Sequence, residues 1–183
     1  DEDLVVANGH VIQTQRLSPI RQVPLLLENR HARFTRRSFP TDSFFGQPHL
    51  GRGLALADID VDGDLDLAIS HNNEPVALLK NVTKPLGRAR PLQLTGTSSN
   101  RDAVGALVEW KVGDSRTSFQ VTGGGSYLSA STYVQILVWP NRQDTRVGQL
   151  RIRWPSGTLQ TLEIPLEEGQ PIDLIEGREP TLR

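Results

Sequence analysis

The stretch LALADIDVDGDLDLAIS, residues 54–70, combines the two features that decide how this chain is expected to fold. Two short apolar runs, 54–57 and 67–70, flank a loop in which every second residue from Asp58 to Asp66 is an aspartate. Short apolar runs bounded by Gly and Asp are typical of strands rather than helices. The stretch therefore predicts two β-strands joined by an acidic loop.

The same strand signal recurs along the rest of the chain, and no stretch carries a capped apolar stripe of helical period. Leu150, Ile152 and Trp154 alternate with Arg151 and Arg153, which is the pattern of a strand buried on one face. We therefore expect an all-β protein. The expected strands are 4–7, 25–28, 54–57, 67–70, 77–80, 91–94, 106–112, 117–121, 134–138, 149–154, 159–164 and 172–175.

The stretch 83–91 is basic, flanked by prolines and poor in large apolar residues, as linkers between domains commonly are. A chain of 183 residues is long enough for two small domains. We expect an N-terminal region at 1–82, a linker at 83–91, a C-terminal β domain at 92–178 and a tail at 179–183.

The N-terminal region contains an internal repeat. Residues 1–8 align on residues 64–71, and residues 24–29 align on residues 75–81 in the same order. Repeats that combine strands and turns favour the blades of a β-propeller. Little more than one blade cannot close a propeller, so we expect the upstream blades of the same chain to be missing from this sequence.

The acidic loop is the sharpest chemical signal. Calcium takes six to eight oxygen ligands, and carboxylates on alternate loop residues can surround one ion. Three side chains would each give one oxygen, a main-chain carbonyl would follow the turn at Gly63, and a last carboxylate would complete the set. In that order the candidate ligands are Asp58, Asp60, Asp62, Asp64 and Asp66.

Two alternatives to this calcium site fit the residues less well. An EF-hand places Glu at the twelfth position, where this chain has Ile69, and it requires flanking helices. A solvated acidic turn would leave five aspartates repelling one another without a compensating ion. The loop therefore indicates Ca²⁺, in a structural rather than a catalytic role.

Composition excludes several classes of function. The chain has 20 Lys+Arg against 21 Asp+Glu, a formal net charge of −1, which gives no reason to expect a nucleic-acid partner. No apolar run approaches the roughly 20 residues that span a membrane. The absence of Cys excludes disulfides and thiolate sites. No residues show a catalytic arrangement, so we expect a protein that is not an enzyme.

Residues 51–57 leading into the aspartate loop, together with 66–69, resemble FG-GAP/VCBS repeats, the calcium-binding blades of integrin-α-like propellers. Residues 92–106, 123–129 and 153–157 resemble the ASPIC/UnbV domain, which follows such repeats in secreted proteins. The chain departs from the ASPIC/UnbV pattern at 138–141, where Gly-Leu-Gly is usual. In the aspartate loop it has Val61 at a position where Asn is common.

These resemblances imply one or more partial propeller blades followed by an antiparallel β-sandwich or a small barrel. They also imply a non-catalytic calcium-binding module, extracellular, at the cell surface or periplasmic, that mediates adhesion or contact with a protein or glycan. The alternative is an accessory or carbohydrate-binding region of a larger secreted enzyme. In that case Trp110, Trp139 or Trp154 would offer the stacking surface for a sugar.

Overall fold

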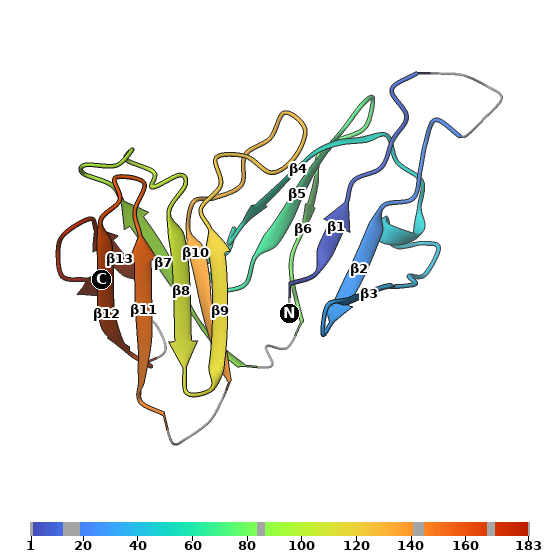
Figure 1. Cartoon of the computed structure of the whole chain (residues 1–183). Coiled ribbons are helices and arrows are strands. Elements are labelled where there is room, and N and C mark those ends of the chain that lie inside the picture. Colours follow the sequence, from blue (N-terminus) through green and yellow to red (C-terminus); the bar gives the residue numbers. More distant parts are fainter. Residues whose placement is uncertain (1, 13–18, 84–86, 141–144, 168–170, 183) are drawn as a thin grey trace. The chain divides into compact units, whose positions relative to one another are not determined.

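The computed structural model describes residues 2–12, 19–83, 87–140, 145–167 and 171–182 (Figure 1). The chain divides into two compact units. The first comprises 1–56, 66–80 and 125–130, and the second comprises 57–65, 81–124 and 131–183. The expected all-β class is confirmed, because the described residues form strands and a single 3₁₀ turn at Phe44–Gly46. None of the described residues forms a helix long and apolar enough to cross a membrane.

The first unit contains two three-stranded sheets, in the orders β1-β2-β3 and β4-β5-β6. Their strands are β1 (Leu4–Val6), β2 (Leu25–Arg30), β3 (Arg33–Arg36), β4 (Gly51–Ala57), β5 (Asp66–His71) and β6 (Ala77–Leu79). All of these except β3 overlap a strand predicted from the sequence. Leu50 and Ile69 are the buried hydrophobic residues that the described part of this unit contributes, so its core is shallow.

The two copies of the repeat pair their strands in the same register. When Asn29 is set on Asn81, the pairs Leu4↔Leu27, Val5↔Leu26 and Val6↔Leu25 of the first copy correspond to three pairs in the second. Those three pairs are Leu67↔Leu79, Ala68↔Leu78 and Ile69↔Ala77. The sequence similarity therefore reflects a repeated antiparallel pair, and not a chance likeness of two short strands.

A segment distant in sequence also belongs to the first unit. Residues 125–130 turn tightly at Tyr127, with Ser126 and Ser129 bridged across the turn. Both serine hydroxyls accept the N–H of Leu54 at 3.2 Å, and the Ser129 hydroxyl donates to the Leu54 carbonyl at 2.8 Å. Serine side chains thus take the hydrogen-bonding place that a neighbouring strand would otherwise fill at this point of β4.

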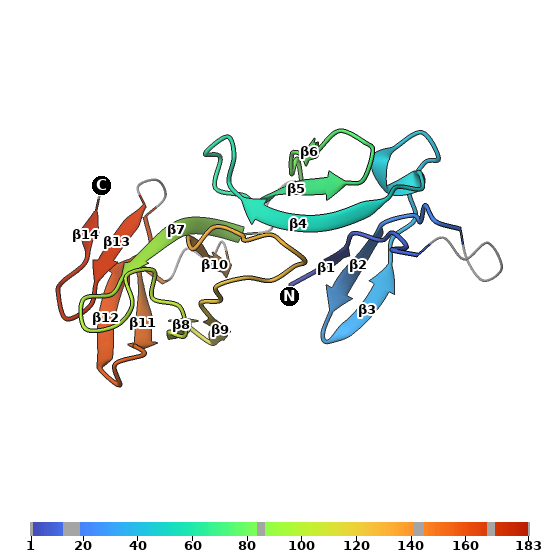
Figure 2. The ribbon, with the colours of Figure 1, turned by 90° about the horizontal axis from the view of Figure 1, so that it is seen from above.

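The second unit contains two four-stranded sheets, in the orders β10-β7-β13-β14 and β12-β11-β8-β9 (Figure 2). Their strands are β7 (Gly87–Thr95), β8 (Leu107–Val112), β9 (Ser115–Gln120), β10 (Gln135–Pro140), β11 (Val147–Arg153), β12 (Leu159–Pro165), β13 (Ile172–Ile175) and β14 (Thr181–Leu182). The pairs are antiparallel except β7 with β13, which is parallel. Among the described residues no sheet closes on itself, so the small barrel is not what forms.

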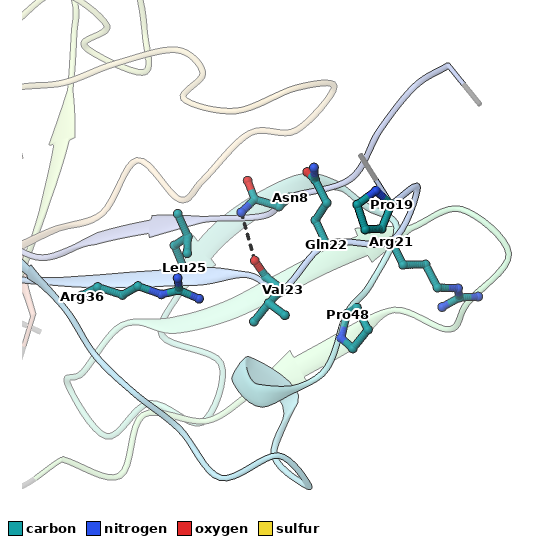
Figure 3. Close-up of a pocket in the computed structure, with 8 residues that line it drawn as sticks. All are labelled: Asn8, Pro19, Arg21, Gln22, Val23, Leu25, Arg36 and Pro48. Atoms are coloured by element: carbon teal, nitrogen blue, oxygen red, sulfur yellow. Dashed lines mark hydrogen bonds between the residues drawn. The ribbon is translucent and has the colours of Figure 1, made fainter. Parts of the chain in front are cut away.

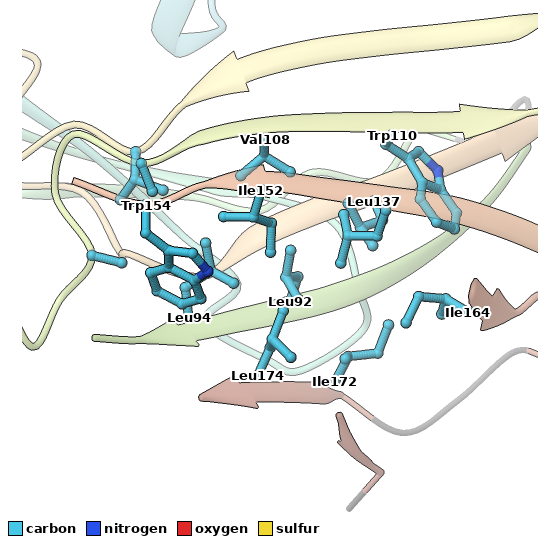
Figure 4. Close-up of a cluster of buried hydrophobic side chains, with 14 of the residues drawn as sticks. Leu92, Leu94, Val108, Trp110, Leu137, Ile152, Trp154, Ile164, Ile172 and Leu174 are labelled. Carbon is cyan, nitrogen blue, oxygen red and sulfur yellow. The ribbon is translucent and has the colours of Figure 1, made fainter. Parts of the chain in front are cut away.

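Both sheets of the second unit contribute to one apolar core (Figure 4). Leu92 and Leu174 come from one sheet, and Val108 and Ile152 come from the other; all four are fully buried. The alternation predicted for β11 is confirmed, because Leu150 and Ile152 are buried while the arginines between and after them are exposed. The period of two in the sequence therefore marks the buried face correctly.

Two expectations about the chain's organisation differ from the structure. Residues 87–91, part of the expected linker, form the first half of β7 and pair with β10. Their backbone bonds and the burial of Arg90 give this basic stretch a place in a sheet although it has few large apolar side chains. The expected tail includes β14, which pairs with β13 through Ile172↔Leu182 and Asp173↔Thr181.

Candidate functional site

The acidic loop connects β4 to β5, and it brings three of the five predicted ligands together. Carboxylate oxygens of Asp58, Asp60 and Asp66 all lie within 4.8 Å of one another. Asp58 and Asp60 lie in the turn, whereas Asp66 is the first residue of β5. Because the three residues belong to one strand–loop–strand connection, the closeness of their carboxylates follows from the local path of the backbone.

The loop holds its shape through hydrogen bonds to its own aspartates. Asp58 accepts the N–H of Asp62 through Oδ1 at 3.1 Å and the N–H of Gly63 through Oδ2 at 3.0 Å. Asp62 accepts the N–H of Asp64 through Oδ1 at 3.0 Å. Gly63 has φ +93°, a left-handed conformation that glycine adopts without a steric cost. These bonds account for the turn that the glycine was predicted to permit.

Val61 also lies in the left-handed region, with φ +61°. A β-branched residue is strained there, whereas asparagine tolerates the conformation. Its side chain is 83% exposed, so it points away from the carboxylates, as expected from the spacing. The preference for asparagine that the resemblance implies at this position therefore has a backbone explanation.

The electrostatics of the three carboxylates favour a cation. Asp66 is only 2% exposed, so water can solvate its charge little, and two further carboxylates approach it. Like charges at this separation repel, and oxygen donors of this kind are those that Ca²⁺ prefers. The donor set thus fits a hard divalent cation. Asp62 and Asp64 do not join the cluster through their carboxylates.

A second polar group in the first unit surrounds Glu74. Its carboxylate contacts Arg21 and His49 Nδ1, the latter at 2.8 Å, and it accepts the N–H of Leu50 at 3.2 Å. The hydrogen bond from His49 and the nearby positive charge of Arg21 lower the pKa of Glu74 against the opposing effect of burial. Phe44 stacks on the His49 ring, with a centroid distance of 4.3 Å. This group ties the loop before β4 to the turn before β6.

Sequence reasoning missed Glu176, a carboxylate in the second unit that is 5% exposed. Its Oε2 accepts three consecutive backbone N–H groups, from Thr97, Ser98 and Ser99, at 2.8–2.9 Å. Its Oε1 accepts the hydroxyls of Ser99 and Ser156 at 3.0 and 2.5 Å. Burial raises the pKa of Glu176, but the hydrogen bonds outweigh it and lower the pKa from 4.5 to about 2. Glu176 is therefore ionised at neutral pH, and we call this carboxylate with its five hydrogen bonds the clamp.

The three tryptophans offered as a sugar platform are core residues. Trp110, Trp139 and Trp154 are exposed by 2%, 5% and 1%. The indole N–H of Trp110 donates to the Val138 carbonyl at 3.1 Å, and its ring meets that of Trp139 edge-on at 6.2 Å. None of the three presents a face to solvent, so a carbohydrate site built on their rings is wrong.

One comparison with known proteins finds a similarity in the C-terminal part. Residues 96–179 match the family model described as ASPIC and UnbV. None of the curated proteins matches the chain. The matched range contains Glu176 and both segments that donate to it, at Thr97–Ser99 and Ser156. Two stretches that carry the sequence resemblance thus meet at a residue that the resemblance had not included.

Proposed function

We propose that this chain is a non-catalytic, calcium-binding extracellular module for adhesion or protein–protein interaction. In this proposal the first unit consists of FG-GAP/VCBS-like blades of an incomplete propeller. The second unit is a β-sandwich of the ASPIC/UnbV type. The observation that carries the proposal is the approach of the Asp58, Asp60 and Asp66 carboxylates to within 4.8 Å.

The residues suggest how the ion would act. Asp58, Asp60 and Asp66 would hold Ca²⁺, with Asp62 and the main chain of Asp64 as further candidates. A bound cation would neutralise the repulsion among the carboxylates and compensate the buried charge of Asp66. Asp58 and Asp62 hydrogen-bond the loop backbone, which suits a role in holding shape. The expected effect of calcium is therefore to stabilise the β4–β5 connection of a domain with a shallow core.

The test is thermal unfolding of the chain in calcium and in chelator. An ion at ten times its Kd adds about 1.4 kcal/mol to the free energy of unfolding, which raises the Tm of a small unit by several degrees. Asp58→Asn and Asp60→Asn should abolish the calcium-dependent rise. Asp114→Asn, at an exposed acid in the turn between β8 and β9, is the matched control and should keep it.

Asp60 is exposed, and unfolding of the Asp60→Asn chain in chelator measures separately any effect of the substitution on the apo fold. If the parent chain melts at the same temperature with calcium and with chelator, the calcium role is excluded. A calcium-dependent rise that survives in both loop variants would place the ion elsewhere and exclude this site.

A further inference from the structure

The hairpin formed by β2 and β3 carries an excess of positive charge. Four arginines, Arg30, Arg33, Arg36 and Arg37, are set against Glu28. Arg30 and Arg37 pair with the two oxygens of Glu28 at 2.9 and 3.1 Å. The hydrogen bond from Arg30 is the main cause that lowers the pKa of Glu28. Two of the four cations thus share one carboxylate, and the hairpin keeps a net positive charge.

Arg33 and Arg36 are the remaining two. Both are exposed, and neither makes a salt bridge or a side-chain hydrogen bond to any residue that the structure describes. They stand on opposite faces of β3, because Arg33 pairs across the hairpin with Arg30 and Arg36 pairs with Leu27. Guanidinium groups bind carboxylates bidentately, so each face of this strand offers a binding group for an acid.

The backbone of β3 offers a second set of binding groups. The strand order is β1-β2-β3, so β3 has a neighbour on one side only. The N–H of Arg37 donates to the Leu26 carbonyl at 2.9 Å, and antiparallel pairing alternates. The N–H and C=O groups of Phe34 and Arg36 therefore point away from β2. Phe34 is also 54% exposed, which adds an apolar contact to this edge.

A groove lies beside one of these cations. It has a volume of about 580 Å³, and Arg36 lines it together with Leu25, on the same face of the sheet, and with Val23 and Pro48 (Figure 3). Asn8, Arg21 and Gln22 also line the groove, so its wall combines apolar and polar side chains. An extended chain that follows β3 could place an apolar side chain in this groove and an acid against the Arg36 guanidinium.

We propose that the open edge of β3 binds an extended acidic peptide as an additional strand, with carboxylates on Arg33 and Arg36. Edge strands commonly carry charge to prevent pairing with further copies of themselves. A basic edge repels the same edge of another copy but can pair with a strand of opposite charge. The backbone of that strand would hydrogen-bond the outward-pointing N–H and C=O groups of β3. A sulfated polysaccharide would use the guanidinium groups alone and leave the backbone edge unpaired. The edge therefore favours a peptide.

The test measures fluorescence anisotropy of a labelled Glu-Val-Glu-Glu-Val-Glu peptide, whose acids fall on both faces of an extended chain, with the full 183-residue protein. Arg33→Glu with Arg36→Glu should weaken binding by about tenfold or more, because two attractive pairs become repulsive. The control, Arg101→Glu with Arg153→Glu, makes the same charge change at exposed arginines of the second unit and should bind like the parent. The thermal unfolding of each variant shows that it folds.

Strand addition makes a further prediction that a general anion site does not. The same peptide with N-methylated valines keeps its charge but loses backbone donors, and it should bind markedly more weakly. Equal binding of the methylated peptide, or displacement by a heparin hexasaccharide without any effect of methylation, would overturn the proposal. So would a parent chain that does not bind the peptide at low salt.

This inference deepens the proposed interaction role, but the hairpin shares no residue with the calcium loop. The anisotropy measurement is made in calcium and in chelator. Peptide binding without a calcium effect on Tm would exclude the calcium role alone. If calcium raises the Tm but the peptide does not bind, peptide binding at the β3 edge is excluded and the calcium role stands.

Discussion

Glu176 shows how one charged residue organises the second unit. Five hydrogen bonds reach its two carboxylate oxygens from the loop after β7 and from the turn after β11. Backbone N–H groups and hydroxyls arranged around a carboxylate stabilise the ionised form, which explains the pKa of about 2. Loss of the charge would leave several buried donors without an acceptor.

The low pKa makes the stability of the second unit depend on pH. The pKa of Glu176 is about 2 in the folded chain and 4.5 as its ordinary value, so the unfolded chain takes up the proton first as the pH falls. The clamp contributes fully above about pH 5, and its contribution of about 3 kcal/mol is lost progressively between pH 5 and pH 2.

Glu176→Gln should remove this dependence and destabilise the second unit by roughly 2–3 kcal/mol at pH 7. Urea unfolding of parent and variant at pH 7 and pH 3 measures both effects. Glu179→Gln, at an exposed acid nearby, is the control and should behave like the parent. A variant with Glu176→Gln that matches the parent at pH 7 would show that the clamp is not stabilising.

The backbone at Val61 supports a stabilising substitution. Its φ of +61° costs a β-branched residue on the order of 1 kcal/mol, and asparagine relieves that strain. Val61→Asn should therefore raise the free energy of unfolding of the chain by about that amount. Val82→Asn makes the same change at a residue that is equally exposed, at 82%, without a positive φ, and should not stabilise. Thermal unfolding in chelator compares them free of any effect of the ion.

At the scale of single elements, Gly148 is the tightest contact within the sheet of β8 and β11. A Cβ at this position would lie 2.1 Å from Cη2 of Trp110, a buried ring that has no room to move. Overpacking of this kind costs typically 1–3 kcal/mol. Glycine in this strand is therefore required by the tryptophan that faces it.

Gly148→Ala should destabilise the second unit by about 1–3 kcal/mol and alter the near-UV circular dichroism of the indole rings. Gly124→Ala is the matched control, because a Cβ there meets nothing within 4 Å. Chemical unfolding followed by tryptophan fluorescence gives the free energies. An unchanged midpoint for Gly148→Ala would mean that Trp110 can be repacked without loss.

The strands that the sequence predicts share one property, an apolar run bounded by turn residues. β3 lacks it, because all four of its residues are exposed and two of them are arginines. Its turn also lacks the usual Asn-Gly signal: His31 and Ala32 have φ of +52° and +60° at the two central positions. β3 forms because it pairs with β2 across the turn. The composition of its own four residues does not indicate that pairing, so the strand was not predicted.

The site was predictable to the extent that it is local. Asp58, Asp60 and Asp66 fall within nine residues of one strand–loop–strand connection, so the local turn of the backbone brings their carboxylates together. Asp62 and Asp64 share the same spacing but do not join them, so spacing alone does not select the three. Glu176 is bonded to residues 77 to 79 positions away, and no spacing within a short window reveals such contacts. The family match covers those residues but does not single out the carboxylate on which they converge.

At the scale of the whole molecule, the two units differ in how much apolar surface they bury. Among the residues that the structure describes, the core of the second unit contains seventeen buried hydrophobic residues, from Leu92 to Leu174, whereas the first unit contributes Leu50 and Ile69. Burial of apolar area is the dominant stabilising contribution to folding. The stability of the first unit should therefore depend on polar contacts, such as those of Glu74, more than that of the second.

Differential scanning calorimetry should accordingly resolve two transitions. The lower one should move with calcium and with Asp60→Asn, because the acidic loop joins strands β4 and β5 of the first unit, and the upper one should move with Glu176→Gln and Gly148→Ala. Glu176→Gln and Gly148→Ala should leave the lower transition in place, because both residues belong to the second unit. A single transition that every substitution shifts equally would show that the two units unfold as one.

The central claim is that the Asp58–Asp66 loop holds a calcium ion, and isothermal titration of the chain with CaCl₂ tests it most directly. We predict one ion bound per chain, with binding lost in Asp60→Asn and retained in Asp114→Asn. A parent chain that takes up no calcium at millimolar concentrations, or an Asp60→Asn chain that binds as the parent does, would contradict it.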